Sequence, residues 1–107
     1  MKRESKFQKE VIDEIQELLP DAIIMKNDPN YIQGIPDLTI LNGDKWATLE
    51  IKRAENEPHQ PNQDFYVDTM RRMSYSAFIF PENRKEIIDE LAQALKPKRR
   101  TRVLKSK

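Results

Sequence analysis

The chain has 107 residues, of which 35% are charged and 37% hydrophobic, with 19 Lys and Arg against 18 Asp and Glu. It contains no cysteine and one histidine, which excludes a disulfide framework, a thiolate metal centre and a multi-histidine zinc site. No apolar run approaches the roughly 20 residues of a membrane span, and the charged start MKRESKFQKE lacks the apolar core of a secretory signal, so we expect a soluble, cytoplasmic protein without a membrane partner.

Charge is distributed unevenly along the chain. Residues 96–107 carry seven of the basic residues and no acidic one, which leaves 12 basic against 18 acidic residues in 1–95. We therefore expect a single folded domain over 1–95 and a basic C-terminal tail over 96–107. The tail can either hold phosphates by counterion release or serve only as a solubilising end. The tail residues that we assign to DNA contact are Lys98, Arg99, Arg100 and Arg102.

The first element is an amphipathic helix. Apolar residues recur at helical spacing over 4–19, and Pro20 ends the segment. Glu4 projects to the middle of the apolar stripe. Two explanations stay open: an acid suits the first turn of a helix, or Glu4 reaches over the sheet towards acids of the hairpin that follows.

A first strand is predicted over 21–27 (DAIIMKN), followed by a polar loop over 28–33. Lys26 stands at the end of this strand and faces the loop. It is either an ordinary exposed lysine or a residue that meets a phosphate.

The stretch from Gly34 to Arg53 predicts a β-hairpin, because Asn42-Gly43-Asp44 separates two β-rich runs. Side chains alternate along a strand, so Glu50 and Lys52 share one face. Asp37, at the start of the partner strand, can reach the same place. Carboxylates bind Mg²⁺, and an ammonium can orient a water or offset phosphate charge. These residues therefore fit metal-dependent phosphodiester cleavage.

Helical spacing resumes from Gln63 to Met73, with Asn62 as a candidate N-cap and Gln63 facing inward. A strand over 76–80 and a helix over 83–95 complete the pattern α-β-β-β-α-β-α. With a right-handed crossover to a parallel fourth strand, the pattern predicts an α/β fold in which a mixed sheet is flanked by helices.

The last helix is rich in aliphatic residues. They exceed what one small sheet face must cover, so they indicate either a dimer surface, extended by Phe78 and Phe80, or packing on the helix's own sheet. The residues concerned are Ile87, Ile88, Leu91 and Leu95.

Taken together, these motifs resemble the PD-(D/E)xK nuclease superfamily and, within it, the virus-type replication-repair nuclease (VRR-NUC) branch. Asp37 with E-x-K alone is a weak signal, whereas the ordered set, each member on its expected element, is more specific. Lys26-Asn27-Asp28 and Tyr31 are also similar to phage-borne members, which implies a phage or bacterial source and the host cytoplasm if phage-encoded. The set comprises Glu4 with Gln8, G-x-P-D at 34–37, E-x-K at 50–52 and Gln63.

The resemblance implies a restriction-endonuclease-like fold and hydrolysis of DNA with Mg²⁺ or Mn²⁺, often at branched structures. Archaeal Holliday junction resolvases, which are similar in core fold, are dimers, so a homodimer is expected if the chain resolves four-way junctions.

The same resemblance implies roles for individual residues. Asp37, Glu50 and the backbone carbonyl of Ile51 would be metal ligands, and Glu4 would bind directly or through water. Lys52 would position the nucleophile. Gln63 would orient Lys52 or a phosphate, or is only a polar residue near a helix start. Arg53 is assigned to DNA contact together with Lys26 and the tail.

Two other functions stay open. The chain could be a non-catalytic DNA-binding or adaptor protein on a nuclease fold, although such a protein gains nothing from carboxylates facing phosphate. It could also be a structural domain in which Glu50 and Lys52 form an ion pair, which would leave Asp37 and Glu4 unexplained. Divalent-metal binding separates the nuclease from both alternatives, and DNA binding in chelator separates the alternatives from each other.

Overall fold

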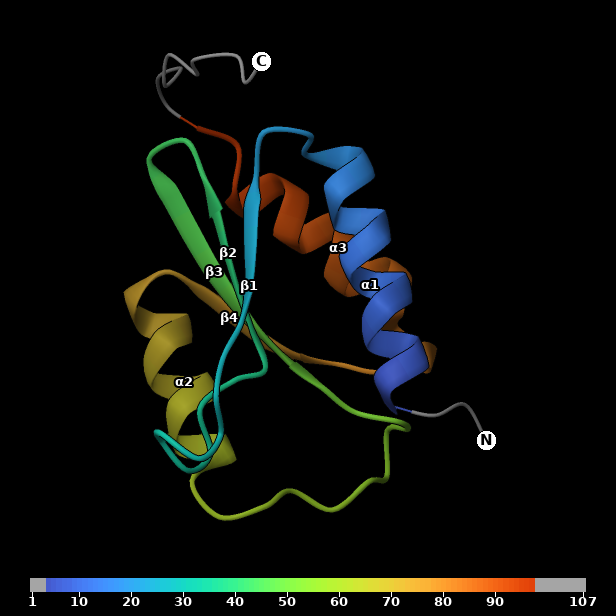
Figure 1. Cartoon of the computed structure of the whole chain (residues 1–107), viewed down its shortest axis with the longest axis vertical. Coiled ribbons are helices and arrows are strands. Elements are labelled where there is room, and N and C mark those ends of the chain that lie inside the picture. Colours follow the sequence, from blue (N-terminus) through green and yellow to red (C-terminus); the bar gives the residue numbers. More distant parts are fainter. Residues whose placement is uncertain (1–3, 98–107) are drawn as a thin grey trace.

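A computed structural model describes residues 4–97. The elements follow in the predicted order, and the prediction of a mixed α/β architecture is confirmed (Figure 1). They are α1 (Glu4–Leu18), β1 (Ile23–Lys26), β2 (Leu38–Asn42), β3 (Lys45–Ile51), α2 (Gln63–Met73), β4 (Tyr75–Ile79), the 3-10 turn η1 (Pro81–Asn83) and α3 (Arg84–Ala94).

The four strands form one sheet in the order β1-β2-β3-β4. The first two pairings are antiparallel, and β4 runs parallel to β3, as predicted. Gly43 lies at the turn of the β2–β3 hairpin with φ of 61°, a conformation that glycine adopts without steric cost. In Figure 1, α1 and α3 lie on one side of the sheet and α2 lies on the other.

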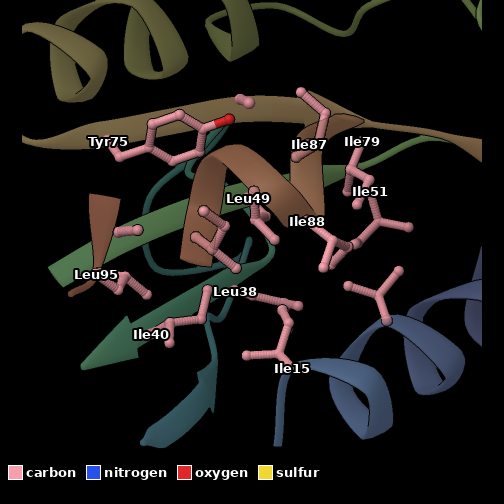
Figure 2. Packing of buried hydrophobic residues seen from close by; sticks show 14 of the residues in the cluster. Ile15, Leu38, Ile40, Leu49, Ile51, Tyr75, Ile79, Ile87, Ile88 and Leu95 are labelled. Carbon is pink, nitrogen blue, oxygen red and sulfur yellow. The ribbon is translucent and has the colours of Figure 1, made fainter. Parts of the chain in front are cut away.

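The hydrophobic core fills the space between the sheet and the pair α1 and α3. Figure 2 shows Ile15 of α1 and Ile88 of α3 directed towards Leu38 and Leu49 of the hairpin. Arg84 also ties the two helices together, because its guanidinium donates to Glu14 at 2.8 Å and to Glu10 at 3.1 Å. This face of the sheet therefore provides most of the apolar burial in the described residues.

The predicted dimer surface on the last helix is wrong. All four aliphatic residues are at most 8% exposed within the single chain: Ile87, Ile88, Leu91 and Leu95. The helix end is held down because Asn42 Nδ2, itself buried, donates to the Leu95 carbonyl at 2.9 Å. Because α1 and α3 share this sheet face, their aliphatic side chains are buried in the core. The alternative prediction, that α3 packs on the sheet of its own chain, is therefore the correct one.

Several predicted boundaries move by one or two residues, for local reasons. The first strand begins at Ile23 rather than 21, because the Ala22 N–H donates to the Leu19 carbonyl and closes a turn after α1. The last helix begins at Arg84 rather than 83, because the Asn83 N–H donates to the Phe80 carbonyl at 3.1 Å and closes a 3-10 turn, which the Asn83 side chain supports by accepting the Phe80 N–H. The fourth strand includes Tyr75 and ends at Ile79.

Replacing a core residue of α3 tests its packing on the sheet. Leu91→Ala should lower the free energy of unfolding by about 2–5 kcal/mol, because Leu91 is 1% exposed and truncation leaves a cavity. Urea denaturation measures this loss. Leu18→Ala is the matched control, since Leu18 is 52% exposed and its truncation should change stability by less than about 0.5 kcal/mol. Equal effects would mean that α3 is not part of the core.

Candidate active site

Asp37 is fixed where three strands come together. Its carboxylate oxygen Oδ2 accepts the N–H of Ile51 at 2.8 Å, across the hairpin from β3. Its carbonyl accepts the N–H of Asn27, just after β1, also at 2.8 Å. The side chain is thereby placed beside the C-terminal end of β3, where Glu50 and Lys52 lie.

Asn27 supports this placement, a role that the sequence analysis did not assign to it. Its side-chain amide donates at 2.8 Å both to the Pro36 carbonyl and to the Thr39 hydroxyl. These bonds hold the backbone on either side of Asp37. A polar residue at the end of a predicted strand is too common to indicate such a role.

Glu50, Lys52 and Gln63 form a continuous hydrogen-bonded chain. The Lys52 ammonium donates to Gln63 Oε1 at 2.6 Å, and the Gln63 amide donates through Nε2 to Glu50 Oε2 at 2.8 Å. Glu50 is 4% and Lys52 3% exposed. The prediction that Glu50 and Lys52 share a face and that Gln63 looks inward is confirmed geometrically, and Gln63 lies between the two charged groups.

The loop before α2 completes the surroundings of Lys52. The ammonium also donates to the Pro58 carbonyl at 3.2 Å, and a Glu57 carboxylate oxygen lies 4.0 Å away. Gln63 is oriented from the same loop, because its Oε1 accepts the Gln60 N–H at 2.9 Å. A buried ammonium needs such oxygen partners. Glu57 and Pro58 were missed because a proline-rich polar loop has no periodicity.

Gly34 explains how α2 is positioned relative to Asp37. It has φ of 89°, and a Cβ atom there would lie 2.6 Å from the Asn62 Cβ and 2.8 Å from the Pro61 carbonyl oxygen. The segment before β2 thus packs directly on the turn that starts α2. Asn62 is the N-cap residue of α2, as predicted, but it adopts a left-handed φ of 72° and its side chain makes no capping hydrogen bond.

Burial dominates the electrostatics of Asp37. Burial raises the pKa of the Asp37 carboxyl above its ordinary value. The hydrogen bond from the Ile51 amide, the hydrogen bond with Glu50 and the positive charge of Lys52 all lower that pKa, but together they do not offset the effect of burial. The folded chain therefore disfavours the Asp37 anion. A bound cation would favour the charged form and offset part of this cost.

Within residues 4–97 no group of three or more His, Asp or Glu side chains could hold a metal ion by itself. A hard divalent cation would therefore need waters in its shell beside the ligands that the resemblance implies, namely Asp37, Glu50 and the Ile51 carbonyl. Mg²⁺ is commonly bound in this way, through one or two carboxylates and several waters. Glu4 begins α1, but its side chain lies outside the described part of the chain.

The residues predicted to contact DNA do not all lie at the site. Lys26 is exposed at the end of β1 and pairs with Leu38, so it lies on the sheet face opposite that of Glu50. Arg53 follows Lys52 directly, is 48% exposed, and its Nε lies 3.4 Å from the Glu57 carboxylate. The tail residues Lys98, Arg99, Arg100 and Arg102 fall outside the described range.

Comparison with known proteins bears on the fold. A solved structure described as a VRR_NUC domain protein superposes with a TM-score of 0.65, at 20% sequence identity, over 90% of this chain and 92% of that chain. The chain has a VRR_NUC-like fold. At this identity the likeness extends to the fold alone. No family model and no curated protein matches the sequence. No helix within residues 4–97 is long and apolar enough to cross a bilayer.

Within this VRR_NUC-like fold, the contact of Gly34 can be tested directly. Gly34→Ala should destabilise the chain by at least about 1 kcal/mol, because it combines a positive φ with a collision against Asn62 and Pro61. Chemical denaturation measures the change. Gly43→Ala is the matched control, since Gly43 also has a positive φ but is exposed in the hairpin turn. If the two variants are destabilised equally, the docking of Gly34 on Asn62 contributes nothing beyond the φ strain.

Proposed function

We propose that this chain is a divalent-metal-dependent deoxyribonuclease that hydrolyses phosphodiester bonds at the site formed by Asp37, Glu50, Lys52 and Gln63. The observation that carries the proposal is the hydrogen-bonded chain from Lys52 through Gln63 to Glu50, beside the half-buried carboxyl of Asp37. The VRR_NUC-like fold supports it.

The arrangement gives each side chain a distinct task. Asp37 and Glu50 would hold Mg²⁺ or Mn²⁺ with the Ile51 carbonyl, and the metal would supply Lewis-acid polarisation of the phosphate and of a bound water. Lys52 would orient the attacking water or offset charge on the phosphate. Gln63 holds the Lys52 ammonium and the Glu50 carboxylate in register, so it acts as a positioning residue.

The two alternative functions use these residues less well. A protein that only binds DNA would place cations at the phosphate. This site instead buries the Glu50 carboxylate and holds beside it the half-buried Asp37 carboxyl, whose pKa is raised. A structural ion pair needs only Glu50 and Lys52, yet the chain also inserts Gln63 between them and aims Asp37 at the same strand end. Both features have a purpose in a metal-dependent nuclease.

The proposal extends to branched DNA as the substrate. Paired cuts in such DNA would require a homodimer. One chain would carry one Asp37/Glu50/Lys52 centre, so symmetric cuts across a four-way junction would require two copies related by a two-fold axis. The aliphatic face of α3 is buried and is not the surface for such pairing. Cleavage of linear, nicked, flapped and four-way DNA tests the substrate, and light scattering tests the homodimer.

Removing the charge of Glu50 and removing the amine of Lys52 should both reduce cleavage, but for different reasons. Glu50→Gln should eliminate cleavage and the rise in melting temperature that Mg²⁺ or Mn²⁺ gives the wild type, because it removes a metal ligand. Lys52→Ala should keep the metal-dependent rise but lower the cleavage rate by ~10²–10⁴. Gel assays of DNA cleavage and thermal denaturation with and without metal measure these effects.

Two controls match the charge changes outside the site. Glu55→Gln removes an exposed carboxylate from the loop between β3 and α2. Lys85→Ala removes an ammonium that is 91% exposed on α3. Both should cleave at the wild-type rate. Wild-type cleavage by Glu50→Gln would remove Glu50 from the site, and unchanged cleavage by Lys52→Ala would assign Lys52 to a structural role.

The basic tail should contribute to affinity rather than to chemistry. Deleting residues 97–107 should weaken DNA binding and reduce the slope of log affinity against log salt by about 0.9 for each phosphate that the tail neutralises in the wild type. Titrations at several salt concentrations measure the slope, and denaturation checks that folding is unchanged. The same slope with and without these residues would identify the tail as a solubilising end.

A further inference from the structure

The single histidine of the chain forms a pair that the function proposed above does not use. His59 lies in the loop between β3 and α2, and its ring nitrogen Nδ1 is 2.7 Å from the Oδ1 atom of Asp64. The side chain of His59 is 35% exposed and that of Asp64 is 75% exposed. Exposed ion pairs commonly contribute little to stability, so the significance of this pair depends on where the imidazole lies.

The backbone on both sides of His59 is bonded to residues of the candidate site. The carbonyl of Pro58, the residue before it, accepts the Lys52 ammonium at 3.2 Å. The N–H of Gln60, the residue after it, donates to the side-chain oxygen of Gln63 at 2.9 Å. His59 therefore stands at the site itself, between two residues that contact its polar side chains.

The imidazole ring is placed by a third contact. It stacks on the ring of Phe78 in β4, with centroids 4.1 Å apart and planes inclined by 18°. Phe78 is the register partner of Glu50 in the parallel pair of β3 and β4. Register partners share one face of a sheet, on strands about 4.8 Å apart. The imidazole thus packs on the side chain that neighbours Glu50, on the same face of the sheet.

Asp64 leaves the second nitrogen of this ring available. An ionised carboxylate only accepts hydrogen bonds, so the hydrogen between the two residues is on Nδ1. The other nitrogen, Nε2, has no hydrogen-bond partner within residues 4–97. Lys52 differs in this respect, because its ammonium is 3% exposed and already donates to Gln63 and Pro58. When the imidazole is charged, Nε2 carries a proton that it can donate, and the carboxylate offsets the positive charge.

We propose that His59 is a further catalytic residue, whose Nε2 donates a proton to the oxygen that leaves the scissile phosphate; this role rests on the nuclease function above. The attacking water forms a new P–O bond, the P–O bond to the leaving sugar oxygen breaks, and the Nε2 proton moves to that oxygen, which departs as a hydroxyl. The attacking water releases its own proton to solvent, and the neutral imidazole regains one from solvent. Asp64 contacts only the imidazole and is a positioning residue.

Two substitutions of His59 separate its nitrogens from its stacking. His59→Phe keeps a ring on Phe78 but has no proton to donate, and His59→Ala removes the ring as well. Both should lower the rate of DNA cleavage with Mg²⁺ or Mn²⁺ by ~10²–10⁴. Added imidazole should restore part of the rate of His59→Ala and none of that of His59→Phe, because only the alanine variant leaves room for the added base. Gel assays measure these rates.

A substrate with a good leaving group reports the proton transfer directly. Both variants should hydrolyse bis(p-nitrophenyl) phosphate at the wild-type rate, because p-nitrophenolate leaves without taking up a proton. A residue that only holds the phosphate or the loop would lower hydrolysis of both substrates. Absorbance of the released p-nitrophenolate measures this reaction, and urea denaturation checks that the variants are folded.

Asp64→Asn tests the positioning of the imidazole. It should lower kcat for DNA less than His59→Phe does, leave KM unchanged and leave hydrolysis of the nitrophenyl diester at the wild-type rate. Asp68→Asn is the matched control, because Asp68 is a 66% exposed carboxylate on the same helix that pairs with Arg72. It should cleave DNA as the wild type does.

The wild-type chain, assayed beside these variants, separates the role of His59 from the nuclease itself. DNA cleavage by His59→Phe at the wild-type rate would overturn the role of His59 and keep the nuclease. An equal loss on DNA and on the nitrophenyl diester, without rescue of His59→Ala by imidazole, would also overturn proton donation and keep the nuclease. A wild-type chain that cleaves no DNA with either metal would overturn both proposals.

Discussion

The Gln63 amide is the interaction on which the candidate site depends. It accepts from an ammonium that is 3% exposed and donates to a carboxylate that is 4% exposed. Charged groups removed from water to this extent are costly unless hydrogen bonds replace their hydration. An amide can serve both partners at once, because it carries an acceptor and a donor on one planar group. A second carboxylate in its place would satisfy Lys52 but repel Glu50.

The position of that amide is in turn set by backbone contacts far apart in the sequence. Gly34 lets the segment before β2 pack on the turn that starts α2, and the Gln60 N–H fixes the amide oxygen. On the other side, Asn27 anchors the backbone that carries Asp37. Glu50 and Lys52 come from the hairpin strand between them. The site therefore combines four short segments, and breaking any one of these backbone interactions would displace a side chain elsewhere.

The sequence predicted the parts of this arrangement that depend on local periodicity. Alternation along β3 placed Glu50 and Lys52 on one face, and Asn42-Gly43-Asp44 placed Asp37 opposite them. It did not predict the support from Asn27 and Pro58, because a side chain bonding to a distant carbonyl leaves no periodic pattern. The dimer surface assigned to α3 was wrong for a related reason: counting aliphatic residues on one helix does not reveal that α1 and α3 enclose a common core. The catalytic roles of the site residues stay predictions.

The alternation along β3 also links stability to function. Leu49 and Ile51 are fully buried in the core beneath α1 and α3, whereas Glu50 and Lys52 face the side of α2. A shift of one residue in the pairing with β2 would exchange these faces, placing two charges in the core and two aliphatic side chains at the site. Core packing therefore penalises that shift heavily. The same apolar contacts that stabilise the sheet therefore fix the pairing of β3 with β2, and with it the face on which Glu50 and Lys52 lie.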